Sequence, residues 1–233
     1  MKHLSNTLGI MLLAVSLSFV ACSKDDDDSD IGNETGSYQP GNIPGMGEAG
    51  GELTGTAFML TDKIEINGGI KGQLFLPEDD DEYCQIKGSG SFVLLSLEFV
   101  NHLGKDTLLV FPAGLTFRAD NIEDQNGILV QETKISLAEG QTCKTFIPTY
   151  CINQEKHGST QNSSYSFGPI TNASPMQELI QLVKNKRINY EDFVHEEDYY
   201  DGVYVLQNAI WSITDRDGLT QENRNEIQSL DDL

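Results

Sequence analysis

Two side chains, the thiol of Cys151 and the amide of Gln207, lie in sequence contexts that are unusual for their residue types. Cys151 ends a predicted strand, Thr142 to Cys151, that runs into a polar loop, so its thiol lies at a strand edge. Gln207 lies inside the apolar stripe of a predicted helix, Gly202 to Thr214. A buried amide costs free energy unless its N–H and C=O groups find partners. We therefore expect the strands to supply a partner for Gln207.

The residues around this pair resemble two motifs of the internal-thioester domains of bacterial surface adhesins. Tyr150-Cys151-Ile152 is similar to the aromatic-Cys-apolar motif that ends a strand in this family. Leu206-Gln207-Asn208-Ala209-Ile210-Trp211 is similar to the apolar-Gln-x-x-apolar-Trp motif on a later helix. The two motifs occur in the family's order, and the resemblance covers the chain from Phe92 to its C-terminus.

The resemblance implies a covalent chemistry for the pair. In the family, the cysteine thiol attacks the glutamine side-chain carbonyl, expels ammonia and leaves a buried thioester that an amine of another molecule later opens. The implied bond here joins Cys151 to Gln207, with Tyr150 and Trp211 as apolar shields against water. His157 is a candidate proton shuttle. The implied partner is a protein or glycan target that carries an amine, and the implied role is adhesion.

Two other interpretations stay open at this point. The first is a non-covalent β-sandwich binding module of the cell surface, with Cys151 in a disulfide or free and Gln207 bonded to exposed backbone at a sheet edge. The second is a Cys-His hydrolase or transglutaminase that would pair Cys151 with His157 or His195. The sequence favours an attachment protein over an enzyme.

No residue pattern calls for a cofactor or a metal ion. Signatures for cradling phosphate, binding a dinucleotide or holding zinc are absent from the sequence. The acidic run Glu78-Asp79-Asp80-Asp81-Glu82 could attract calcium, but it lacks the alternating ligand spacing and the glycine of a calcium loop. We interpret it as a solvated turn and expect no metal site.

Strands followed by helices must position the pair. This order of elements along the sequence predicts an α+β domain, an antiparallel β-sandwich followed by helices. Alternating apolar residues predict strands at Thr54–Leu60, Ile70–Leu76, Ser91–Val100, Thr107–Phe111, Ile128–Leu137 and Thr142–Cys151. A polar loop from Asn153 to Ser166 should follow the last strand. Helices are expected from Ser174, over Gly202 to Thr214, and over Leu219 to Leu230. The sandwich would then occupy residues 52–151, and the loop and helices residues 152–233.

The N-terminus predicts export and lipidation. Lys2 provides a positive n-region, and Leu8 to Val20 form an apolar stretch too short to span a bilayer comfortably. Phe19-Val20-Ala21-Cys22 resembles a lipobox, in which the signal peptide is cut before a cysteine that has received a diacylglycerol. Residues 1–21 are therefore a predicted lipoprotein signal peptide, and Cys22 is the predicted lipid anchor to the membrane.

The segment after the anchor predicts a surface location and a flexible tether. Ser23-Lys24-Asp25-Asp26-Asp27-Asp28 resembles the acidic export signal that some Gram-negative lipoproteins carry after the lipidated cysteine. Residues 31–51 are rich in Gly, Pro, Asn and Glu and have no apolar periodicity. We expect an outer-membrane lipoprotein exposed at the surface, with an acidic tether at residues 22–51 and one domain at residues 52–233.

The net charge limits the classes of ligand, and the cysteine count limits the possible disulfides. The formal net charge of −21 argues against nucleic acid or an anionic membrane surface as a ligand. With Cys22 lipidated, an odd number of cysteines, Cys84, Cys143 and Cys151, remains in an oxidising compartment. If Cys151 is consumed by Gln207, as the resemblance implies, Cys84 and Cys143 are left to pair with each other.

The anchor prediction has a direct test, because Cys22 is the only residue of the leader able to take the lipid. Cys22→Ala should release the protein from the membrane fraction or block its processing. Fractionation of cells expressing each form checks this, and unchanged retention of the variant in the membrane fraction would refute the anchor.

Overall fold

The computed structural model describes residues 38–77 and 83–233, which form strands followed by helices along the chain. The predicted signal peptide, Cys22, the acidic run after it and the candidate calcium segment lie outside these residues. The strands are β1 Gly55–Thr56, β2 Ile64–Gln73, β3 Gln85–Ile86, β4 Val93–Asn101, β5 Thr107–Phe111, β6 Leu115–Ala119, β7 Gly127–Ile128, β8 Thr133–Leu137, β9 Thr142–Cys151 and β10 Ser164–Thr171. The helices are α1 Ser174–Val183, the 3-10 helix η2 Tyr190–Asp192, α2 Glu196–Thr214 and α3 Gln221–Ser229.

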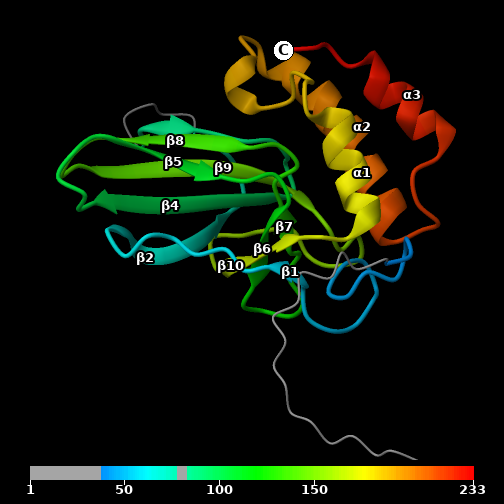
Figure 1. The fold of residues 1–233 in the computed structure, drawn as a ribbon, viewed down its shortest axis with the longest axis horizontal. Coiled ribbons are helices and arrows are strands. Elements are labelled where there is room, and N and C mark those ends of the chain that lie inside the picture. The colour runs from blue at the N-terminus through cyan, green and yellow to red at the C-terminus, as the bar shows by residue number, and fades with distance from the viewer. Residues whose placement is uncertain (1–37, 78–82) are drawn as a thin grey trace, which may run out of the picture. The chain divides into compact units, whose positions relative to one another are not determined.

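Six of the strands form a closed barrel. Their order is β10-β2-β4-β9-β7-β6, and β6 pairs again with β10, so the ring has no free edge. Each pair of neighbours in the ring is antiparallel. In the same sheet β1 also pairs with β10 and β3 with β9, and β5 and β8 form a separate two-stranded sheet. Figure 1 shows the strands gathered on one side of the domain and the three helices side by side on the other.

The predicted fold class, an α+β domain with an antiparallel β-sandwich followed by helices, is wrong. The domain is mainly β-structure, a closed six-stranded barrel with a small second sheet and three short helices. The decisive strand is β10, which starts inside the segment expected to be a polar loop. Tyr165 in this strand pairs with Ile70 of β2 and with Ala119 of β6, so β10 joins the two edges that a sandwich would leave open.

The expected strand from Ile128 to Leu137 is also divided between two sheets. β7 ends at Ile128 inside the barrel, and β8 starts at Thr133 in the small sheet. Between them the buried Gln131 donates hydrogen bonds to the carbonyl groups of Val183, the last residue of α1, and of Lys186, just after it. Where the chain leaves the barrel, it therefore supplies partners for carbonyl groups at the end of this helix. The expected strands Thr107–Phe111 and Thr142–Cys151 match β5 and β9.

Alternation along β4 and β9 fills the barrel. Leu95 and Phe99 of β4 and Cys143, Ile147 and Cys151 of β9 point to the same buried interior. Within each strand these residues are spaced by four positions, an even number, as expected for one face of a strand. The barrel core is therefore built from the same strand that carries the candidate thiol.

A second core lies between the barrel and the helices. Tyr150 of β9 and Ile152, just after this strand, belong to it, together with the apolar faces of α1, α2 and α3. Burial of this shared apolar surface holds the helical layer against the barrel. No helix in the described part of the chain is both long enough and apolar enough to cross a membrane.

Residues 38–51, which we call the N-terminal strap, pack against this second core. Ile43 and Met46 are each 1% exposed. The backbone N–H of Gly41 donates to the carbonyl of Ile213 at 2.8 Å, and that of Gly47 donates to the carbonyl of Ile152 at 2.7 Å. The packed domain therefore begins before Glu52, and the tether expected over residues 22–51 does not extend through the strap.

The strap depends on glycine where it passes the end of α2. A Cβ atom added at Gly47 would lie 2.0 Å from the carbonyl oxygen of Thr214, and φ at this position is +56°. Gly47→Ala should lower the free energy of unfolding by about 1–3 kcal/mol, because backbone on both sides must shift. Thermal or denaturant unfolding measures this.

Gly50→Ala is the matched control for the strap. A Cβ atom at Gly50 meets no atom within 4 Å, so this variant should unfold within about 0.5 kcal/mol of the unchanged protein. Equal effects of the two substitutions would contradict the packing of the strap.

Candidate functional site

The candidate site lies where strand β9 ends beneath helix α2. Cys151 is the last residue of β9 and is fully buried. Its side chain belongs to the barrel core, whereas that of the preceding residue, Tyr150, belongs to the core under the helices. Strand alternation thus directs the thiol inward and the tyrosine outward.

Gln207 reaches from α2 to the backbone of Cys151 and meets it twice. The backbone N–H of Cys151 donates to Gln207 Oε1 at 3.0 Å. Gln207 Nε2 donates to the backbone carbonyl of Cys151 at 2.8 Å. Gln207 is 1% exposed, so both bonds lie in a dry environment. The partner that the sequence analysis required for a buried amide is therefore the cysteine residue itself.

These two bonds replace a missing stretch of strand. β4 pairs with β9 only as far as Val93, which lies opposite Thr149. The N–H and C=O groups of Cys151, two residues further along β9, point to the same side as those of Thr149. At that position β4 has already ended, so the amide of Gln207 completes the ladder. The acyl carbon of Gln207 consequently lies beside the residue that carries the thiol.

The thiol is held by two N–H donors. The backbone N–H of Asn153 donates to Cys151 Sγ at 3.3 Å, and Trp211 Nε1 donates to it at 3.5 Å. Burial raises the pKa of the Cys151 thiol to about 11, although both donors and the charge of Lys156 lower it. Because this pKa lies well above neutrality, the sulfur keeps its proton at physiological pH.

Trp211 lies against the sulfur, to which its Nε1–H donates. Its ring centroid lies 5.3 Å from that of Phe92, and both side chains are half-buried against the barrel core. Tyr150, the other residue expected to shield the sulfur, does not contact it in this way, because its side chain packs on the other face of β9, where its hydroxyl bonds to Ser89.

The histidines considered as acid-base partners of Cys151 are exposed. His157 lies in the loop after β9, where its backbone bridges to Asp124, and His195 is the N-cap residue of α2. The hydrogen-bond donors to Cys151 Sγ within the described residues are instead the N–H groups of Asn153 and Trp211. The geometry of a Cys-His catalytic pair, with a base in hydrogen-bond reach of the thiol, is not formed here.

The other two cysteines of the described chain pair with each other. Cys84 and Cys143 form a disulfide with a Cα–Cα distance of 5.6 Å. Cys151 is left as a free, buried cysteine. The distribution agrees with the pairing that the family resemblance implies.

Asn153 and the strap are parts of the site that the sequence analysis missed. Asn153 Nδ2 donates to the carbonyl oxygens of Gly45 at 3.2 Å and Gly47 at 3.1 Å. Its Oδ1 accepts from the backbone N–H of Asn126 at 3.1 Å. These bonds fix the backbone N–H that points at Sγ. An asparagine just after a strand and a glycine-rich segment were the available signals, but neither indicates its partner.

A hollow of about 690 Å³ opens beside this network. Its lining includes Asn153 and Asn126 on the barrel side and Gly45 and Gly47 on the strap side. The residue whose N–H holds the sulfur thus also faces an open hollow.

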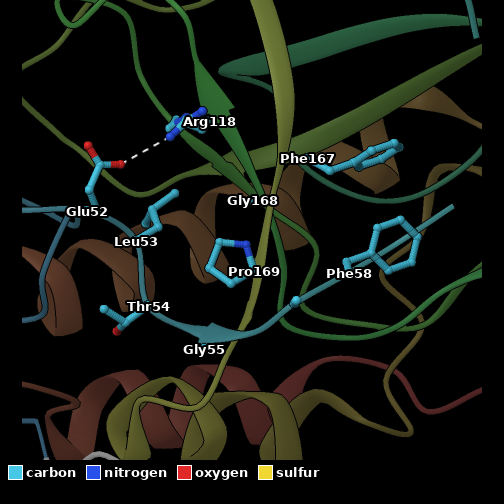
Figure 2. Close-up of a pocket in the computed structure, with 10 residues that line it drawn as sticks. Glu52, Leu53, Thr54, Gly55, Phe58, Arg118, Phe167, Gly168 and Pro169 are labelled. Carbon is cyan, nitrogen blue, oxygen red and sulfur yellow. Dashed lines mark hydrogen bonds and ion pairs between the residues drawn. The ribbon is translucent and has the colours of Figure 1, made fainter. Parts of the chain in front are cut away.

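A second hollow, of about 480 Å³, lies where β1 meets β10 (Figure 2). Figure 2 shows Arg118 and Glu52 facing each other across it, with an N–O distance of 3.2 Å. Phe58, Phe167 and Pro169 form its apolar part. Its lining includes neither Cys151 nor the residues bonded to Cys151, so we assign it no part in the site.

Residues 38–77 and 83–233 contain no group of three or more His, Cys, Asp or Glu side chains placed to hold a metal ion. Comparisons with protein-family models, curated proteins and solved structures find no match to this chain. The chemistry proposed for the site therefore rests on the geometry of the site itself.

The ladder-completing role of Gln207 predicts a large loss of stability on truncation. Gln207→Ala leaves the N–H and C=O of Cys151 buried without partners, so the free energy of unfolding should fall by about 2–5 kcal/mol. Asn208→Ala is the matched control, since Asn208 is exposed on the same helix turn, and it should change stability by less than about 0.5 kcal/mol. Similar effects of both changes, measured by denaturant unfolding, would contradict the geometry.

Proposed function

We propose that this protein is a cell-surface lipoprotein, anchored through Cys22, that attaches covalently to an amine-bearing target through a thioester between Cys151 and Gln207. The outer membrane is its proposed location and adhesion its proposed role. The lipobox and the acidic run support the location, and the geometry around Cys151 supports the chemistry.

One observation carries the proposal. The side-chain amide of Gln207 is bonded at both of its ends to the backbone of the very residue that bears the free thiol. The residues that carry the nucleophile and the acyl group are therefore joined by the fold before any reaction, which lowers the entropic cost of bringing the two groups together. A glutamine that only completed a ladder would not require a free thiol beside it.

The forming reaction balances with the groups present. Cys151 Sγ attacks Cδ of Gln207, the Sγ–Cδ bond forms, and the Cδ–Nε2 bond breaks. The thiol proton, which the raised pKa of about 11 keeps on sulfur, moves to Nε2, and ammonia leaves. During the attack, negative charge develops on Oε1, where the backbone N–H of Cys151 already donates at 3.0 Å.

The same surroundings support storage and later use of the thioester. Cys151 is fully buried and in contact with Trp211, so water is kept from the sulfur and hydrolysis is slowed. An amine of the target would attack Cδ, the C–S bond would break, and a proton from the amine would return to sulfur. The product is an amide between the target and residue 207, together with a free Cys151 thiol.

Methylamine tests this proposal. The unchanged protein should gain one methylamine at Gln207 with loss of ammonia, and Cys151 should then become reactive toward a thiol reagent after denaturation. Peptide mass spectrometry locates both changes. Cys151→Ala should not react, because it lacks the nucleophile that activates the acyl group.

Glutamine variants supply the matched comparison. Gln207→Glu should also fail to incorporate methylamine, because a thiol does not form a thioester with a carboxylate without prior activation of the carboxylate. Gln228→Glu makes the same chemical change at an exposed glutamine of α3 and should react like the unchanged protein. Folding of each variant is checked by its unfolding transition. Methylamine incorporation that is equal in folded Cys151→Ala protein would overturn the proposal.

A further inference from the structure

The exposed side of helix α2 forms a continuous surface that ends at the thiol. We call this surface the α2 outer face, and its residues are Glu197, Tyr200, Asp201, Tyr204, Asn208 and Trp211. They recur at spacings of three or four positions, so they share one side of the helix. The opposite side carries the buried residues that pack on the barrel.

Aromatic rings line the first half of this face. The ring centroids of Tyr200 and Tyr204 lie 6.4 Å apart, and those of Tyr199 and Tyr200 lie 5.1 Å apart. Tyr204 is 56% exposed, and nearby Val194 is 92% exposed. Such exposed, rigid aromatic side chains are enriched where proteins bind partners.

Exposed acidic groups surround these rings. Glu196, Glu197, Asp198 and Asp201 form no ion pair within the part of the chain that the structure describes. Glu196 is hydrogen-bonded to the side chain of Tyr200. Acidic side chains in the first turn of a helix interact favourably with the helix dipole, which explains in part why Glu196 to Asp198 are acidic. The dipole does not explain Asp201, one turn later, or the aromatic rings beside it.

A cation–π contact occurs beside the N-terminus of α2, outside the face itself. The guanidinium of Arg187 lies over the ring of Phe193, 4.9 Å from its centroid. On the face, Tyr204 presents an exposed ring. A guanidinium or ammonium group is a suitable ligand for such a ring.

The α2 outer face is continuous with the proposed thioester site. Trp211 belongs to the face and donates its Nε1–H to Cys151 Sγ. Gln207 lies one turn before Trp211 on the neighbouring, buried side. A chain lying along the face would pass directly over the residue that shields the sulfur.

We propose that the target is a protein with a basic segment, which docks along the α2 outer face and delivers a lysine amine at Trp211. The inference rests on the proposed function and specifies its partner. Charge complementarity favours a basic segment, since the face is acidic and the whole chain carries a net charge of −21. The same net charge disfavours a second copy of this chain as the occupant.

The geometry sets a spacing for the segment. Tyr200 and Trp211 are separated by 211 − 200 = 11 positions of α2, which is about 16 Å of helix. An extended peptide covers this distance in about five residues. Arginines placed about five residues from a lysine should therefore reach the tyrosines while the lysine reaches Trp211.

Synthetic peptides test the proposal with two measurements. The probe carries two arginines about five residues from one lysine, and the control has the same composition with the arginines next to the lysine. Binding is measured by fluorescence anisotropy on the full chain carrying Cys151→Ala, which cannot form an adduct. The rate of adduct formation is measured on the unchanged chain, with methylamine as the reference amine.

The spaced peptide should bind more tightly and react faster than its control, and added salt should weaken both effects. The double variant Glu197→Gln with Asp201→Asn should weaken binding about three- to tenfold, the effect of losing one or two exposed ion pairs. It should leave the methylamine rate unchanged. The control Glu222→Gln with Glu226→Gln removes equal charge from α3 and should bind like the unchanged chain.

The outcomes separate the two proposals. Equal binding of the spaced and control peptides, or no loss in the α2 variant, would overturn the docking face even if methylamine is incorporated. Selective peptide binding without methylamine incorporation would overturn the thioester and leave the docking face standing.

Discussion

The pair of hydrogen bonds between the amide of Gln207 and the backbone of Cys151 is the contact on which the arrangement of this domain depends. It stands where strand β4 has ended and β9 continues, so a side chain from α2 supplies the missing partner for two buried backbone groups. Buried backbone without partners is costly, and few side chains offer both a donor and an acceptor at the right separation. The helix layer is thereby fixed in position against the barrel at this point.

That constraint brings together parts of the chain that are distant in sequence. The strap contacts the carbonyl of Ile152 and the side chain of Asn153, and Asn153 in turn directs a backbone N–H at the sulfur. Trp211 donates its Nε1–H to the same sulfur. The thiol is consequently dry, protonated and held beside an acyl group. These are the conditions under which a thioester can form once and persist.

The sequence predicted the need of Gln207 for a partner in the strands better than it predicted the fold around that contact. A glutamine inside an apolar stripe and a cysteine at a strand end are local signals, and local signals sufficed to predict that Gln207 needs a partner in the strands. The closure of the barrel by β10 was not predictable in this way, since it depends on pairing between segments far apart along the chain. The strap was missed because its glycines and prolines resemble a linker, although Ile43 and Met46 anchor it. The position of Tyr150 could have been inferred, because neighbours in a strand face opposite sides.

The central claim is that a covalent bond joins Cys151 to Gln207, and peptide mapping of the untreated protein tests it most directly. Digestion under mildly acidic, denaturing conditions should release the peptides containing these two residues as one linked species. Its mass should be lower by one ammonia than the sum of the two peptides. The link should resist a reductant of disulfides and be cleaved by hydroxylamine. Recovery of the two peptides separately, with a free thiol at Cys151 and an intact amide at Gln207, would contradict the account.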